Sequence, residues 1–129
     1  MRFVTTDAGY LEAAHAGAAR LGHREHVRLA WLVIRAEGAD VGGDRVARIL
    51  RSLAEAHGEG DRYLETLPRF WIRLVAHTIE VEPGIEDFDV FAERFPLLLD
   101  GSIVTKHWTS EVLETGRRAW IEPDVRALP

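Results

Sequence analysis

Apolar residues recur every three to four positions over most of this chain, which is the spacing of one face of an α-helix. The first such stretch predicts a helix from Asp7, a residue type that caps helices well, to about Ala19. A second helix is predicted from His23 to Glu37, and Gly38 should end it. No stretch alternates apolar and polar residues as a half-buried strand would. The first third of the chain is therefore expected to be helical.

Two further helices are expected in the middle of the chain. The segment Gly42-Gly43-Asp44 is expected to form a turn and to cap a third helix, from Asp44 to about His57. A fourth helical pattern covers Tyr63 to Glu80 but contains Pro68, which removes a backbone hydrogen bond inside a helix. This helix should either bend at Pro68, which we favour, or begin near Thr66. The residues expected to face inward are Val46, Ile49, Leu50 and Leu53 on the third helix, and Leu64, Leu67, Phe70, Trp71, Leu74, Val75 and Ile79 on the fourth.

Beyond the break at Pro83-Gly84, the pattern divides into shorter units. The expected elements are a short helix from Glu86 to about Arg94, a weaker helical stretch from Leu97 to about Trp108, and a last short helix from Thr109 to about Thr115. The apolar segment from Trp120 to Val125 should lie across the domain as a strap. Residues 1–129 are thus expected to form one all-α domain, a compact bundle of about five to seven helices with an extended C-terminal strap.

Composition narrows the classes of function that this domain can serve. A length of 129 residues suits a single core, and the absence of cysteine excludes disulfides, thiolate metal sites and thiol nucleophiles. The formal net charge of -5 argues against nucleic-acid binding, which requires a basic surface. No apolar stretch is long enough for a bilayer or resembles a signal peptide, so we expect no membrane partner and a cytoplasmic location. No phosphate loop or dinucleotide fingerprint occurs, and no cofactor is expected.

Two histidines at the start of the second predicted helix are the strongest candidates for chemistry. On a helical wheel, His23 and His26 fall on the same apolar arc as Val27, Ala30 and Trp31. Inward-facing imidazoles need a partner, a ligand or a water pocket, because buried polar groups are costly when they are unpaired. Both residues are expected in the first helical turn, where free backbone N–H groups disfavour a positive ring. Either histidine could therefore act as a general base.

The fourth predicted helix should supply the other side of this site. Tyr63 and Thr78 fall on its inward arc and could orient a substrate or share the proton, which makes Tyr63 a third catalytic candidate. Trp31 and Trp71 could form an apolar wall, and Arg28 could hold an anionic group, although its arginine stripe is also typical of a solvated face. The leading interpretation is a small-molecule pocket between the second and fourth helices. It would serve a binding protein or a cofactor-free enzyme, such as a lyase, for proton transfer, elimination or cyclisation, and whether the protein is an enzyme stays open.

Other interpretations remain open on the residues alone. Two histidines three apart can share a metal ion, and Glu65 and His77 would be the remaining ligands, but the His-x-x-His spacing alone is a weak signal. Glu65 also fits an i,i+4 surface pair with Arg69, and each histidine could instead bond a backbone carbonyl. The further alternative is a non-catalytic accessory subunit or homodimer that buries its extra aromatic residues against a partner.

The run His23-Arg24-Glu25-His26-Val27-Arg28-Leu29-Ala30-Trp31 resembles a motif of a family of small uncharacterised all-helical bacterial proteins, His-Arg-(Asp/Glu)-His-(Val/Leu)-Arg-x-Ala-Trp. The segments Tyr63 to Thr66 and Trp120 to Arg126 extend the similarity. The resemblance implies an all-helical fold and a site at the first motif, and it implies no particular activity. Relatives tend to carry histidine where this chain has Leu64, so a potential third metal ligand is missing, and the resemblance therefore implies a specialised or inactive site. They carry a threonine-type residue in place of Pro68, which implies a reshaped helix here.

Overall fold

The computed structural model of the chain describes residues 6–18, 21–60, 65–115 and 120–128. Within these ranges it contains six α-helices, two short 3₁₀-helices and no strand, so the all-α prediction is confirmed. The elements in chain order are α1 (Asp7–His15), α2 (His23–Glu37), α3 (Ala39–Ala56), α4 (Thr66–Val81), α5 (Phe88–Arg94), η2 (Pro96–Leu99), η3 (Gly101–Lys106) and α6 (Ser110–Thr115). The bounds of α2 are those that the apolar pattern and Gly38 predict.

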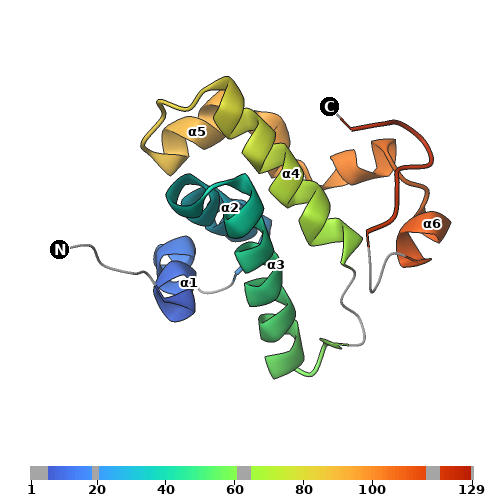
Figure 1. Ribbon diagram of the computed structural model, residues 1–129, viewed down its shortest axis with the longest axis horizontal. Coiled ribbons are helices and arrows are strands. Elements are labelled where there is room, and N and C mark those ends of the chain that lie inside the picture. Colours follow the sequence, from blue (N-terminus) through green and yellow to red (C-terminus); the bar gives the residue numbers. More distant parts are fainter. Residues whose placement is uncertain (1–5, 19–20, 61–64, 116–119, 129) are drawn as a thin grey trace.

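Helix α2 is the central element of the fold and packs against α1, α3 and α4 (Figure 1). Its buried residues belong to the larger of two hydrophobic clusters: Val27, Leu29, Ala30, Trp31, Val33 and Ile34. The smaller cluster joins Phe70 of α4 to Val104 of η3 and to Trp108. Figure 1 shows α1 and α6 at opposite ends of the molecule. Leu74 of α4 packs against both clusters, so the two clusters meet along this helix.

Helix α3 begins five residues earlier than the sequence predicts. Gly42 and Gly43 are buried inside the helix, so the prediction of a turn at Gly42-Gly43-Asp44 is wrong. A Cβ atom at Gly42 would lie 3.0 Å from both the Ile34 Cα and the Val33 carbonyl oxygen, and one at Gly43 would lie 2.9 Å from the Ile72 Cγ2. The glycines therefore allow the close approach of α3 to α2 and α4, and this packing outweighs their poor helix propensity.

Replacing Gly42 with alanine is expected to lower the free energy of unfolding by about 1–2 kcal/mol, even though alanine is the better helix former by roughly 1 kcal/mol. The new methyl group would meet backbone atoms of α2, which can move only if the two helices separate. Equilibrium urea unfolding measures this change. Gly84→Ala is the matched control, because a Cβ atom there has nothing within 4 Å. A Gly42→Ala protein more stable than the wild type would contradict the close α2–α3 contact.

Helix α1 differs from the prediction at both of its ends. Thr6, rather than Asp7, is the N-cap, and its hydroxyl oxygen accepts a hydrogen bond from the Gly9 N–H at 3.0 Å. The helix ends at His15, because Ala16 adopts a left-handed conformation with φ 46°. Within the described part of the predicted range, the helix is therefore complete before Ala16. The sequence did not mark this end, because alanine rarely takes that conformation.

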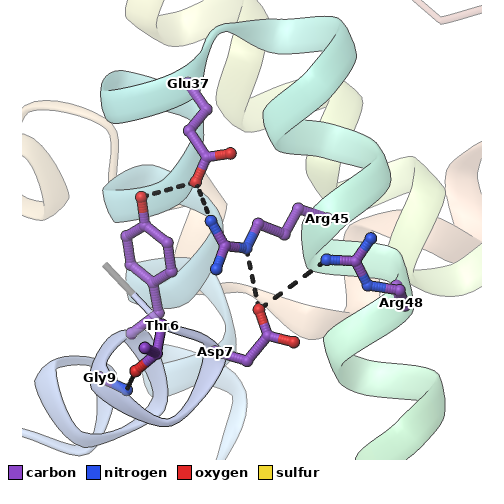
Figure 2. Close-up of polar contacts among 7 residues, drawn as sticks. Thr6, Asp7, Gly9, Glu37, Arg45 and Arg48 are labelled. Atoms are coloured by element: carbon purple, nitrogen blue, oxygen red, sulfur yellow. Dashed lines mark hydrogen bonds and ion pairs between the residues drawn. The ribbon is translucent and has the colours of Figure 1, made fainter. Parts of the chain in front are cut away.

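The polar group that docks α1 onto α2 and α3 is drawn in Figure 2. The Arg45 guanidinium donates to Asp7 Oδ1 at 2.9 Å and to Glu37 Oε2 at 2.6 Å, and the Tyr10 hydroxyl donates to the same Glu37 oxygen at 2.7 Å. The Tyr10 hydrogen bond and the Arg45 cation lower the pKa of Glu37, while its partial burial opposes them. The carboxylate therefore stays ionised and keeps three helices joined.

Helix α4 begins at Thr66, so the favoured bend at Pro68 is wrong and the alternative start is confirmed. Pro68 is the third residue of the helix. An N–H group in the first turn has no intrahelical partner, so proline removes no helical hydrogen bond there. The buried residues of α4 are Thr66, Phe70, Ile72 and Val75. Tyr63 and Leu64 of the predicted inward face lie outside the described residues.

The C-terminal third departs from the prediction in one place. Two 3₁₀-helices replace the single helical stretch expected over Leu97–Trp108, because the chain turns at Asp100, whose carboxylate accepts from the Ser102 N–H at 3.0 Å. Helix α5 begins after its N-cap Asp87, and α6 follows Thr109, as the capping residues indicate. The predicted strap is present, since the Trp108 indole N–H donates to the Ile121 carbonyl at 3.0 Å.

Candidate functional site

A cavity of about 720 Å³ lies between α2, α3 and α4. Its apolar wall comes from all three helices and includes Ala30, Val46, Leu50, Leu53, Trp71 and Ile72. Its polar lining consists of His23, His26, His57 and Glu59. The cavity thus combines an apolar body with a few polar groups, which is the usual composition of a small-molecule site. The prediction of a pocket beside His23 and His26 agrees with this geometry, but the prediction placed it between the second and fourth helices alone and did not include α3, which forms much of the wall.

His23 is held in place by two contacts. Its Nε2 atom lies 2.8 Å from the Leu98 carbonyl oxygen, and because a carbonyl only accepts, the Nε2–H group donates. Its ring packs edge-on against Trp71, with 4.4 Å between the ring centroids. The proton on Nε2 is therefore committed to the backbone of η2, and Nδ1 is the nitrogen that remains for another partner. His23 therefore agrees with the interpretation in which a histidine bonds a backbone carbonyl group.

His26 is in a different state from His23. Its ring is half-buried in the cavity wall, and no hydrogen bond joins it to another residue in the described part of the chain. Burial lowers the pKa of His26, the neighbouring His23 ring lowers it further, and Glu25 partly opposes both. The Glu25 carboxylate itself accepts from the Gly22 N–H at 3.0 Å, at the start of α2. His26 is therefore a neutral imidazole at neutral pH, with its lone pair free for a ligand.

His57 and Glu59 are cavity residues that the sequence analysis did not select. Both are exposed and follow the last residue of α3, so the polar rim of the cavity lies where it meets solvent. A periodic signal for His57 does exist, because Leu50, Leu53 and Ala54 precede it by seven, four and three positions and line the same cavity. Glu59 lies beyond the helix, where periodicity gives no direction, so only the tertiary structure could place it.

The other predicted binding residues have different surroundings. Trp71 lines the cavity, whereas Trp31 is buried against Phe88 and Phe91 in the larger core cluster. The Arg28 guanidinium pairs with Asp89 at 3.3 Å and lies over the Phe88 ring. The Thr78 hydroxyl donates to carbonyl oxygens of its own helix, at 3.0 Å to Leu74 and 2.9 Å to Val75. Of these residues, only Trp71 joins the two histidines. The predicted catalytic residue Tyr63 lies outside the described residues.

The residues of the metal hypothesis are not brought together. Glu65 is 7% exposed, and its carboxylate accepts from Arg51 at 2.7 Å and from Arg69 at 3.2 Å. The predicted i,i+4 pair with Arg69 is thus confirmed, but it is partly buried rather than on the surface. His77 is exposed on α4 and is absent from the cavity lining. Across the residues that the structure describes, no three histidine, aspartate or glutamate side chains form a group that could hold a metal ion.

Comparison of the chain with family models, with curated proteins and with solved structures found no match. The resemblance carried by the run from His23 to Trp31 therefore stays a prediction. In the described ranges, no helix is both long enough and apolar enough to cross a bilayer. The cavity and its histidines are consequently the observations from which a function can be argued.

Proposed function

We propose that the protein binds a small, mainly apolar molecule in the cavity between α2, α3 and α4, and that His26 removes a proton from it as a general base. The observation that carries this proposal is the His26 ring, which is half-buried, without a hydrogen-bond partner in the described chain, and belongs to a residue that lines a cavity of about 720 Å³. A structural histidine in such a place normally satisfies a neighbouring polar group, as His23 does with Leu98.

The reaction class that fits this site is a proton transfer or an elimination without a cofactor. A neutral imidazole accepts a proton, and the burial that lowers the pKa of His26 keeps its ring in this neutral form at neutral pH. His23 supports the reaction by position: its ring packs against Trp71 and is fixed by the Leu98 carbonyl, so it forms a rigid side of the site. Its Nδ1 atom can accept a hydrogen bond from a bound molecule.

A probe of this proposal is 5-nitrobenzisoxazole, an apolar bicyclic molecule whose ring opens when a base removes one proton. The base takes the proton from C3, the N–O bond breaks, and the product is the coloured 2-cyano-4-nitrophenolate. We expect the wild-type protein to open the ring at a rate that saturates with probe concentration and exceeds that of free imidazole at the same concentration. A rate that stays linear in probe and equals that of free imidazole would contradict binding at a built site.

The pH dependence of this rate identifies the base. Only the neutral ring accepts a proton, so the rate should rise as the pH increases through the pKa of His26 and then level off. Because burial lowers that pKa, the midpoint is expected below 6.5, the ordinary value for histidine. This is tested by measuring the saturating rate between about pH 4.5 and about pH 8, a range that spans the ordinary pKa of histidine. A midpoint above 6.5 would assign the proton transfer to a different group.

A further inference from the structure

We infer that the molecule bound in this cavity is an apolar amine, carried as an ammonium ion whose charge is met by Glu59; this inference rests on the proposed function. The lining supplies a wide apolar wall from three helices, with the Trp71 ring at one side. A volume of about 720 Å³ is within the range of pockets that hold drug-sized molecules. The apolar body of the ligand is therefore expected to be about the size of one or two rings.

The charge of the lining selects the polar part of the ligand. Glu59 is the one formally charged side chain among the described lining residues, which include no arginine and no lysine. No ion pair to Glu59 is formed within the described ranges. A cation entering here gains a partner, whereas an anion meets like charge.

Two arginines of α3 and α4 do not alter this balance. Arg51 and Arg69 both donate to the buried carboxylate of Glu65, and Arg69 also donates to Asp44 at 2.8 Å. Their charges are thus already matched, and neither lines the cavity. His26 is at the start of α2 and Glu59 lies beyond the end of α3, so the two polar groups come from different segments of the chain. A bound amine would therefore be oriented, with its ammonium group at Glu59 and its body against Trp71.

Three probes with the same phenylbutyl body separate shape from charge: 4-phenylbutylamine, 4-phenyl-1-butanol and 4-phenylbutanoate. Their dissociation constants are measured by calorimetry at pH 7.5 and low ionic strength with the full chain. We expect the amine to bind about two- to fivefold more tightly than the alcohol, which is the size of an exposed ion pair, and the carboxylate to bind more weakly than the alcohol. Salt should reduce the preference for the amine, because it screens an exposed charge.

Glu59→Gln should remove the preference for the amine over the alcohol. Glu80→Gln is the control, because it removes an equal charge from an exposed position near the C-terminal end of α4, away from the α4 residues that line the cavity, and it should leave the preference unchanged. Equal affinities of the amine and the alcohol for the wild type would overturn the inference while leaving the cavity as a binding site. So would a preference that survives Glu59→Gln. If neither the amine nor the alcohol binds, the proposed function itself fails, and the inference about the amine fails with it.

Discussion

Replacing His26 with glutamine is expected to lower the saturating rate of 5-nitrobenzisoxazole opening by roughly 10²-fold or more, the usual contribution of a positioned general base. Glutamine keeps the polarity and approximate size of the side chain but cannot accept a proton at neutral pH. The His26 ring has no hydrogen bond to lose within the described chain, so the free energy of unfolding at pH 7 should change by less than about 1 kcal/mol.

The same substitution should also make the protein lose less stability when the pH is lowered. The folded-state pKa of His26 is lowered, so the unfolded chain binds a proton at this residue more readily than the folded one. Wild-type stability should therefore fall as the pH drops below 6.5, and part of this fall should be absent in His26→Gln. Urea unfolding at pH 7 and at about pH 5 measures the difference. A variant that loses the same stability as the wild type on acidification would show that His26 is not desolvated.

His77→Gln is the matched control for the rate, because His77 is exposed on α4 and does not line the cavity. It should turn over the probe like the wild type. His23→Gln should retain most of the rate, because the His23 proton is bound by the Leu98 carbonyl and a glutamine amide can also donate there. If His23→Gln loses the rate and His26→Gln keeps it, His23 rather than His26 is the base.

Trp108→Ala is expected to have the largest effect on stability, a loss of about 3–5 kcal/mol. Trp108 is 1% exposed and lies at the centre of the smaller core cluster. Its ring packs against Phe70 at 5.3 Å and Trp120 at 5.5 Å between centroids, and its indole N–H donates to the Ile121 carbonyl at 3.0 Å. Truncation removes the aromatic contacts, leaves a cavity, and frees the C-terminal strap.

Urea unfolding followed by circular dichroism measures this loss, and a second variant keeps it measurable if the alanine protein does not fold. Trp108→Phe retains most of the ring but not the hydrogen bond to Ile121, so its loss should be smaller, about 1–2 kcal/mol. Trp120→Ala is a useful comparison, since Trp120 is only partly buried and should cost less than Trp108→Ala. Losses below about 1 kcal/mol for both Trp108 variants would contradict the packing of the smaller cluster.

The positions of the helices were predictable where the apolar pattern and a capping residue agreed. Helix α2 is the best case, because its apolar arc is continuous from Val27 to Ile34 and Gly38 follows it directly. The start of α3 was not predictable, since Gly42 and Gly43 are typical of turns until their contacts with α2 and α4 are known. The end of α1 at Ala16 is a similar case. Local preferences are worth about 1 kcal/mol per residue, and packing between helices exceeds them.

The candidate site was predictable in part. The wheel placed His23 and His26 on the inward face of α2, and both line the cavity. The wheel also placed Trp31 there, but this ring is buried against α5 instead. Periodicity shows that a side chain points away from solvent, and it does not show which neighbouring helix the side chain meets. For the same reason Arg28 pairs with Asp89, 61 positions along the chain, where no local pattern could indicate it.

What the sequence by itself determined is the helical class of the fold, the bounds of α2 and the inward direction of its two histidines, because each depends on residues within a few turns of one another. The tertiary structure alone decided that the His23 ring bonds Leu98 while the His26 ring has no hydrogen bond within the described chain, and that His57 and Glu59 join them around one cavity. These residues are separated by 31 to 75 positions in the chain wherever they meet across elements. Contacts over such separations depend on how whole helices pack against one another, and the local sequence around a residue does not indicate which distant residues it will contact.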